Sequence, residues 1–317
     1  MYGHLPYTRT APHPFALEEP NLHLLHQIAS AQAPHLTVLQ AIILGIVQGL
    51  TEFAPVSSSG HLILVPWLGN WSILHNEQLN KTFDVALHIG TFVGAIGYFR
   101  HDIVRYLKAW FHSIRTRRAG TMDERIAWYI VIGTIPGAVV GILFEDVIEE
   151  KLGEPWLIAV MLAIFAVVLL IVDRKAPQDH GLEGLTMKRS LLIGVAQAVS
   201  LQPGVSRSGV TVTAARGTGM TRESAARFSF LLALPIIGGA GLYKGFQLAT
   251  GSQHMPAGFA GPFIAGMIAS AVAGFLVIWG LLAYLRRGSF LPFVIYRLAV
   301  CAIVLGLIAG GVRPATV

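Results

Sequence analysis

Charged residues are scarce in this sequence. Only 13% of the 317 residues are Asp, Glu, Lys or Arg, and 54% are hydrophobic, whereas soluble globular domains average roughly 25% charged residues. The ten-residue alternating segments of a membrane barrel are also missing, while several runs approach the about 20 apolar residues that a helix needs to cross a bilayer. The composition therefore excludes a soluble protein and predicts an all-α integral membrane protein.

Cysteine is nearly absent as well, and Cys301 is the single one, so no internal disulfide can form. The net charge is +6, but the basic residues fall in short segments between apolar runs, which is the pattern that sets membrane topology. Membrane lipids are therefore the expected surroundings, and no nucleic-acid partner is expected. Residues 1–35 lack a continuous apolar run, so we interpret them as an extension outside a single membrane domain at 36–317.

The apolar segments fall into two kinds. Two regions, 36–69 and 185–215, are interrupted in the middle by "FAPVSSSG" and "LQPGVSRSG", so neither reads as one continuous helix. The other segments are uninterrupted runs that could each span a membrane. These six predicted spans are 83–100, 127–144, 156–172, 228–246, 263–285 and 291–311.

Lys and Arg between the spans predict the topology. Seven of them lie in the predicted loop at 100–126, which should face the cytoplasm, whereas the predicted loop at 145–155 holds five acids against Lys151 and should face outward. The region 185–215 has basic segments on both sides, so it must enter and leave by the same face. The region 36–69 precedes an inward-running span and should dip in from the outside. Both regions are thus predicted to be re-entrant helical hairpins.

The two interrupted regions also resemble each other. Aligned without a gap, 36–60 and 185–209 are identical at eight of 25 positions, which are Leu36, Thr37, Gly45, Gln48, Val56, Ser57, Ser59 and Gly60 of the first region. Each copy would be one hairpin followed by three spans, and an odd number of spans inverts the second copy. We therefore predict an inverted repeat of 36–172 and 185–311, an arrangement that many transporters use to build a site near the midplane.

The two turns hold the polar groups of greatest chemical interest, because polar groups at membrane depth are costly and usually functional. Gln48 and Glu52 lie four residues apart, on one face of a helix, and Arg207 of the second turn aligns with Ser58 of the first. A hydroxyl, a carboxylate, an imidazole and a guanidinium fork are the components of phosphoryl transfer. The candidate catalytic residues are Glu52, Ser58, His61 and Arg207. The candidate substrate-binding residues are Gln48, Ser57, Ser59, Gly204, Ser206, Ser208 and Thr211.

Simpler interpretations exist for several of these groups. Serines in a membrane turn often only satisfy freed backbone groups, and Arg207 could be an ion-pair partner that joins Glu52 to the second half. Asp84 and His88 have the spacing of a metal pair but lie at the end of a span, where an exposed or hydrogen-bonded role is favoured. The acids between 145 and 150 read as a solvated loop.

The motifs "QGLTEFAPVSSSGHL" and "QPGVSRSGVT" closely resemble the two signature regions of the undecaprenyl-diphosphate phosphatase family, the bacitracin-resistance proteins of the bacterial plasma membrane. The resemblance extends from about residue 36 to the C-terminus. It implies a hydrolase that converts the polyprenyl diphosphate carrier to its monophosphate, releases phosphate and recycles the carrier for peptidoglycan synthesis and cell wall biogenesis. It also implies bacitracin resistance and a site open to the periplasmic face.

The resemblance further implies roles for individual residues. Ser58 matches the serine proposed as nucleophile, His61 the motif histidine and Arg207 the motif arginine. Gln48 occupies the first position of the family's E/Q-x-x-x-E motif and cannot act as a base, so the carboxylate role falls to Glu52. The family's activity is helped by a divalent cation, Mg²⁺ or Ca²⁺, for which Glu52 is the expected ligand. A homodimer is left open.

Two mechanisms and one rival function fit these residues. Ser58 could attack phosphorus with Glu52 or His61 accepting its proton, or water could attack directly without a covalent intermediate. The rival function is a transporter or flippase of a polyprenyl phosphate, to which inverted repeats are equally suited. Only hydrolysis needs a nucleophile beside an acid or base, so the residues favour the enzyme.

Overall fold

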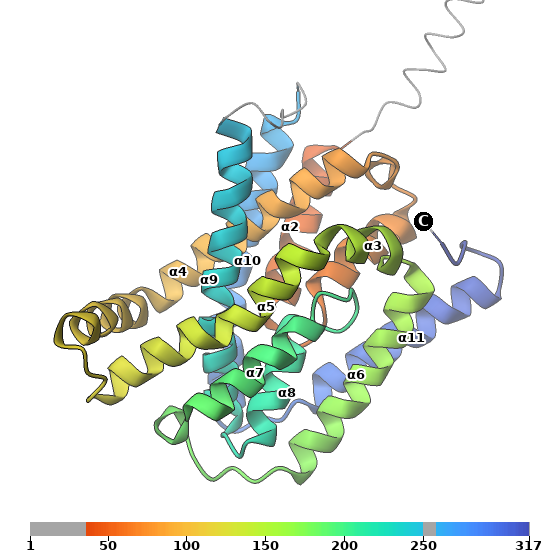
Figure 1. Ribbon diagram of the computed structural model, residues 1–317. Coiled ribbons are helices and arrows are strands. Elements are labelled where there is room, and N and C mark those ends of the chain that lie inside the picture. Colours follow the sequence, from red (N-terminus) through yellow and green to blue (C-terminus); the bar gives the residue numbers. More distant parts are fainter. Residues whose placement is uncertain (1–35, 250–257, 317) are drawn as a thin grey trace, which may run out of the picture.

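The computed structural model describes residues 36–249 and 258–316, and every element in these ranges is a helix (Figure 1). The α-helices are α2 (Val38–Phe53), α3 (Ser58–Gly69), α4 (Glu77–Thr116), α5 (Met122–Leu152), α6 (Pro155–Lys175), α7 (Met187–Val199), α8 (Arg207–Gly217), α9 (Arg222–Ala249), α10 (Ala260–Leu285) and α11 (Leu291–Ala309). Two short 3₁₀ helices, η1 (Ser72–His75) and η2 (Leu182–Gly184), lie in the connections.

Six helices are long and apolar enough to cross a membrane. They are α4, α5, α6, α9, α10 and α11. Five of the predicted spans lie within these helices, and the sixth, 291–311, runs two residues past the end of α11 at Ala309. In α6 the mean hydropathy reaches 3.0 and the basic residues are confined to the last turn. The prediction of an all-α, multi-pass membrane protein is thereby confirmed, while the predicted extension at 1–35 lies outside the described residues.

Two predicted loops are wrong, because the helices continue past their apolar parts. The basic segment 100–126 was expected to be a loop, but α4 runs for 40 residues to Thr116 and only 117–121 connect it to α5. Forty helical residues measure about 60 Å, twice the thickness of the hydrocarbon core. Likewise α5 extends to Leu152 through most of the expected acidic loop. Water can solvate the backbone and charges of such extensions, so hydropathy marks the buried part of a helix and not its end.

The two interrupted regions are two pairs of short helices, α2 with α3 and α7 with α8. Between the members of each pair the chain turns at a serine with a positive φ angle, 76° at Ser57 and 77° at Ser206, a conformation that costs free energy for a residue other than glycine. Each serine is also the N-cap of the following helix, and its hydroxyl accepts a hydrogen bond from the backbone N–H of Gly60 or Gly209. The same local structure therefore occurs at equivalent positions of the two regions.

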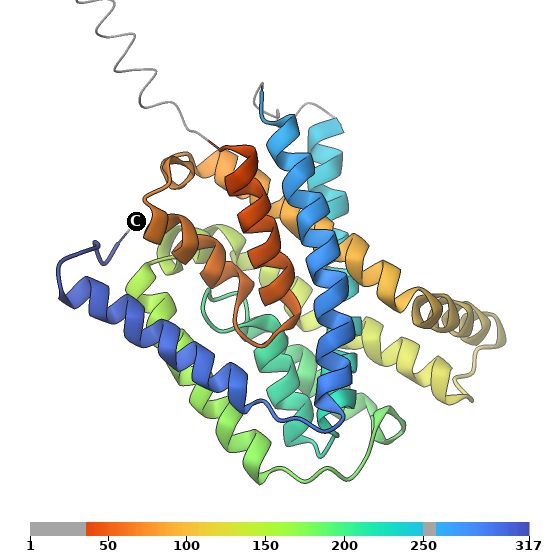
Figure 2. The same ribbon diagram turned by 180° about the vertical axis from the view of Figure 1, so that it is seen from behind.

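Glycines allow each pair to pack closely against a long helix from the other half of the chain. A Cβ atom on Gly45 of α2 would collide with the carbonyl of Gly266 on α10, and one on Gly194 of α7 would collide with the carbonyl of Gly133 on α5. Small residues at such contacts let helix backbones approach each other in membranes. The pairs are thus held between the spanning helices, with α9 and α10 on one side and α6 and α11 on the other (Figures 1 and 2).

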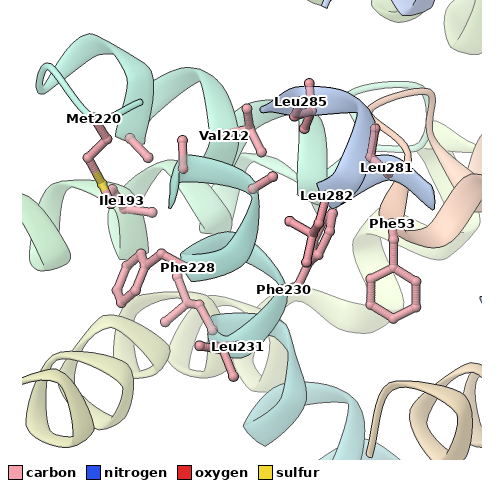
Figure 3. Packing of buried hydrophobic residues seen from close by; sticks show 14 of the residues in the cluster. Phe53, Ile193, Val212, Met220, Phe228, Phe230, Leu231, Leu281, Leu282 and Leu285 are labelled. Carbon is pink, nitrogen blue, oxygen red and sulfur yellow. The ribbon is translucent and has the colours of Figure 1, made fainter. Parts of the chain in front are cut away.

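The main hydrophobic core adjoins the end of α2 (Figure 3). Phe53 packs edge-on against Phe230 of α9, with ring centroids 5.2 Å apart, and Leu282 of α10 belongs to the same cluster. Ile193 of α7 and Val212 of α8 extend the cluster into the second pair. One core therefore fixes both pairs against α9 and α10.

Candidate active site

Glu52, in the last turn of α2, lies at the centre of a cluster of polar side chains. Only 5% of the residue is exposed. One carboxylate oxygen accepts hydrogen bonds from Gln48 Nε2 at 2.9 Å and from Ser58 Oγ at 2.6 Å, and the other is paired with the guanidinium of Arg207. A buried carboxylate is stable only when it is paired and hydrogen-bonded, and here both oxygens have such partners.

Ser58 and Arg207 reach Glu52 from matching positions in the two turns. Ser58 is the first residue of α3 and Arg207 is the first residue of α8, each directly after the serine with positive φ. Ser58, the candidate nucleophile, and Arg207, the candidate cation, both contact the carboxylate of Glu52. This shared contact joins the two halves of the chain. Both the predicted site and the simpler interpretation of Arg207 as an ion-pair partner of Glu52 agree with this contact.

The two turns also interlock through hydrogen bonds between them. Ser57 Oγ accepts a hydrogen bond from the backbone N–H of Gly204 at 3.0 Å, and Ser208 Oγ donates one to the carbonyl of Ala54 at 2.9 Å. Ser57, Gly204 and Ser208 are three of the residues predicted to bind substrate. In the structure their polar groups are used to hold one turn against the other.

The remaining predicted serines and Thr211 differ in accessibility. Ser206 Oγ lies 3.2 Å from Ser208 Oγ, and Thr211 donates to the carbonyl of Arg207 at 2.7 Å and contacts Ser229 of α9. The side chains of Ser206 and Thr211 are buried, whereas Ser59 is partly exposed on the first turn of α3. Among these three residues, Ser59 alone is accessible to a ligand.

His61 is hydrogen-bonded to groups other than Glu52. Its Nδ1 lies 2.6 Å from the carbonyl oxygen of Ser57, and its Nε2 lies 2.8 Å from the hydroxyl of Tyr296 on α11, whose ring stacks on the imidazole. A carbonyl oxygen can only accept, so Nδ1 carries a proton. With both ring nitrogens engaged in this way, His61 is not positioned to take a proton from Ser58.

His88 on α4 occupies the place beside Glu52. Its Nδ1 is bonded to the carbonyl of Asp84 at 2.8 Å, and its Nε2 lies 3.5 Å from the same oxygen of Glu52 that accepts from Ser58. The side chain is 32% exposed. The hydrogen-bonded role favoured from the sequence agrees with the Asp84 contact, but the proximity to Glu52 was not predicted, because spacing along one helix does not reveal a neighbour on another.

Arg297 is a second residue that sequence reasoning missed. It lies in the second turn of α11, is 0% exposed, and donates to backbone carbonyls of both turns. An arginine inside an apolar run is itself a signal, since charges at membrane depth are rare and usually have a specific purpose.

The residues around Glu52 do not form an obvious metal site. Within 36–249 and 258–316, no group of three or more His, Cys, Asp or Glu side chains could hold a metal ion. Both oxygens of Glu52 already have donors as partners, one of them the cation Arg207, whereas Mg²⁺ and Ca²⁺ need several oxygen ligands. Gln48, which donates to Glu52 through Nε2, has its Oε1 buried without a hydrogen-bond partner. The donor set therefore does not fit a resident cation, and the Mg²⁺ or Ca²⁺ at Glu52 stays a prediction.

The accessible side of the cluster presents a hydroxyl, an imidazole and a guanidinium around a buried carboxylate. Ser58, Arg207 and His88 are all partly exposed, while Glu52 is covered. Glu52 can accept the proton of Ser58 over a 2.6 Å hydrogen bond, which meets the distance requirement for a general base. Arg207 offers the planar fork that binds phosphate oxygens. The cluster can thus bind a phosphate group and attack it.

Curated proteins with similar sequences include several undecaprenyl-diphosphatases. The chain is 46% identical over 265 residues to the undecaprenyl-diphosphatase of Pelotomaculum thermopropionicum, covering 83% of this chain and 94% of that protein. It is 43% identical over 272 residues to the undecaprenyl-diphosphatase of Moorella thermoacetica, covering 86% and 98%. For the undecaprenyl-diphosphatase of Geobacter sulfurreducens the identity is 45% over 262 residues, covering 82% and 94%.

The family assignment agrees with these relatives. The sequence model described as bacitracin resistance protein BacA matches residues 41–303, a range that begins in α2 and ends in α11 and so includes both turns, five spanning helices in full and most of the sixth. The chain belongs to the bacitracin resistance protein BacA family.

Proposed function

We propose that this protein hydrolyses undecaprenyl diphosphate to undecaprenyl phosphate and inorganic phosphate, and so recycles the lipid carrier for peptidoglycan synthesis. The relatives' name supports the substrate. The observation that carries the chemistry is the shared carboxylate: Glu52 accepts a hydrogen bond from Ser58 and pairs with Arg207. A nucleophile, its base and an anion-binding cation are thereby brought within one cluster.

The first chemical step begins when the terminal phosphate of the substrate approaches Arg207. The guanidinium turns its fork to the phosphate oxygens, which releases one oxygen of Glu52. Glu52 then accepts the proton of Ser58 as Oγ attacks the terminal phosphorus. The bond from phosphorus to the bridging oxygen breaks, undecaprenyl phosphate leaves with the electron pair, and the phosphoryl group stays on Ser58.

The second step removes the phosphoryl group. Water attacks the phosphorus of the phosphoserine, and Glu52 returns the proton that it accepted in the first step to Ser58 Oγ, which leaves as the hydroxyl. Both protons of the water depart with inorganic phosphate, and Glu52 is again a carboxylate. In the alternative without a covalent intermediate, water attacks the substrate directly and Glu52 accepts its proton. The 2.6 Å contact between Ser58 and Glu52 favours the covalent route, since the hydroxyl is already aligned with its base.

We further propose that the two short-helix pairs are re-entrant hairpins of an inverted repeat, with the site open to the periplasmic face of the plasma membrane. The nearly equal φ angles of Ser57 and Ser206 support the repeat. So does the matched packing of Gly45 and Gly194, each against a glycine of the opposite half.

The topology can be tested by labelling cysteines in intact cells. In a Cys301→Ala background, a cysteine in place of Ser59 should react with a membrane-impermeant maleimide added outside, and one in place of Arg118 should react only after the membrane is opened. The reverse pattern would reject the orientation.

The function itself is tested by incubating the purified protein with undecaprenyl diphosphate and measuring free phosphate, with and without Mg²⁺ or Ca²⁺. Release of one phosphate per substrate is expected. If phosphate is not released under either condition while vesicles containing the protein redistribute a polyprenyl phosphate between leaflets, the transporter interpretation replaces the enzyme.

A further inference from the structure

Arg297 carries a buried charge, and its hydrogen-bond acceptors in the described part of the chain are all backbone carbonyls. Its guanidinium donates to the carbonyl of Leu162 at 3.0 Å and lies 3.5 Å from that of Met161, both on α6, and its other contacts are carbonyls of the two turns. Within the described part of the chain, Arg297 forms no ion pair with a carboxylate. Burying such a charge is costly unless its donors are hydrogen-bonded. The five carbonyls therefore offset the cost of burying the guanidinium of Arg297.

The carbonyls of the two turns are equivalent in the aligned sequences. Arg297 Nη1 donates to Pro55 at 3.1 Å, and Nη2 donates to Gly204 at 2.9 Å and to Val205 at 3.1 Å. Pro55 and Gly204 occupy the same position when 36–60 is aligned with 185–209. The two arms of one guanidinium therefore contact matching atoms of the two turns.

We infer that Arg297 is a positioning residue of the active site, which fixes the two turns at the separation that lets Ser58 and Arg207 meet at Glu52. Ser58 follows Pro55 by three residues, and Arg207 follows Gly204 by three. Because each separation is so short, a displacement of the Pro55 carbonyl should also displace Ser58, and a displacement of the Gly204 carbonyl should also displace Arg207. Displacement of about 1 Å at a catalytic group can lower turnover by about a hundredfold.

Arginine suits this position because the planar guanidinium has five donors in a fixed fork, whereas the ammonium of lysine is compact and cannot reach carbonyls on opposite sides. The inference rests on the proposed function, because it concerns the positions of Ser58 and Arg207 in that reaction. It also makes a purely structural statement, that the separation of the turns depends on Arg297.

Arg216 provides the matched control. It too is a fully buried arginine that donates to backbone carbonyls, those of Pro177 at 2.8 Å and Ala176 at 2.9 Å, and it also pairs with Asp173. Its partners lie outside both turns. An Arg216→Lys variant therefore measures the general effect of replacing a buried arginine in this protein.

The experiment compares Arg297→Lys with Arg216→Lys in two measurements on folded, detergent-purified protein. The first is kcat and KM for release of phosphate from undecaprenyl diphosphate. The second needs no activity: spin labels on cysteines at Leu50 and Val199, which are exposed near the ends of α2 and α7, report the distance between the pairs in a Cys301→Ala background. We expect Arg297→Lys to lower kcat by about a hundredfold and to broaden the distance distribution, and Arg216→Lys to change neither.

Several results would overturn the inference. Wild-type kcat and an unchanged distance distribution in Arg297→Lys would reject it, as would equal losses of kcat in the two variants. If Arg297→Lys fails to fold, Arg297→Gln tests the point with a neutral amide, and failure of both while Arg216→Lys folds would make Arg297 a residue of overall stability instead. If the wild type releases no phosphate, the proposed function fails, and the spin-label distances still decide whether Arg297 sets the separation of the turns.

Discussion

Ser58 and Arg207 occupy matching positions, each the first residue of the helix that follows a turn, and both contact the same carboxylate. The two aligned turns thus contribute different chemistry, a hydroxyl from one and a guanidinium from the other. Because Glu52 belongs to the first region alone, its hydrogen bond to Ser58 is local and its ion pair with Arg207 crosses between the halves. The proposed site is complete only when both halves are packed together.

Replacing Glu52 with Gln should abolish most turnover. Glutamine keeps the shape but cannot accept the proton of Ser58, and loss of general base catalysis typically costs 10²–10⁴-fold. We expect kcat for phosphate release to fall by about that factor. The control is Asp102→Asn, which removes another ion pair between helices, with Arg227, far along α4 from His88. Equal losses in both variants would mean that Glu52 acts only through stability.

Replacing Ser58 with Ala distinguishes the covalent route from direct attack by water. Without Oγ a phosphoserine cannot form, so turnover should fall by about 10³-fold or more. In the wild type, rapid quenching with substrate labelled on its terminal phosphate should trap label on Ser58. Substantial turnover in Ser58→Ala, together with failure to trap labelled enzyme, would assign Ser58 a positioning role and favour direct attack by water.

Replacing Arg207 with Lys should weaken both binding and catalysis. Lysine keeps the charge but loses the two parallel N–H donors that match phosphate oxygens, and removal of one such donor typically costs about 10²–10³-fold in kcat. The effect is measured by comparing kcat and KM of Arg207→Lys with those of Arg227→Lys, which is the control. If near-normal turnover persists, Arg207 serves only as the ion-pair partner of Glu52.

His61 should act through Tyr296 and not as the base. Because His61 Nε2 and the Tyr296 hydroxyl contact each other at 2.8 Å, His61→Gln and Tyr296→Phe should lower kcat by similar, modest factors of about tenfold, which corresponds to the 1.4 kcal/mol of a lost buried hydrogen bond. The double variant should be scarcely worse than either single one. A much larger loss in His61→Gln alone would restore the role of proton acceptor that the motif suggests.

Much of this site could be predicted because its signals are local in sequence. The pairing of Gln48 with Glu52 follows from helical spacing, and the alignment of Ser58 with Arg207 follows from the comparison of the two turns. What could not be predicted depends on which helices meet. The direction of His61 is set by Tyr296, 235 positions away, and His88 reaches Glu52 from α4.

The helix ends were predicted least well. Hydropathy falls where a helix leaves the membrane, but the hydrogen bonds of α4 continue to Thr116, where Arg117 adopts a left-handed conformation with φ of 52° and ends the helix. The predicted number of spans is therefore confirmed, but the predicted lengths of the helices are wrong.

The matched packing of Gly45 and Gly194 leads to a prediction about stability. A methyl group at either position meets a backbone carbonyl of the opposing helix, which cannot move without shifting α10 or α5. Gly45→Ala and Gly194→Ala should therefore each destabilise the protein, by about 1–3 kcal/mol as for other overpacked contacts.

Gly280→Ala on α10 is the control, because a Cβ there has nothing within 4 Å and alanine is favoured over glycine in a helix by about 1 kcal/mol. Thermal unfolding in detergent should lower Tm for the first two variants and leave it unchanged or higher for the third. If Gly45→Ala and Gly194→Ala behave like Gly280→Ala, the short-helix pairs are packed less closely than the structure indicates, and the matched contacts no longer support the inverted repeat.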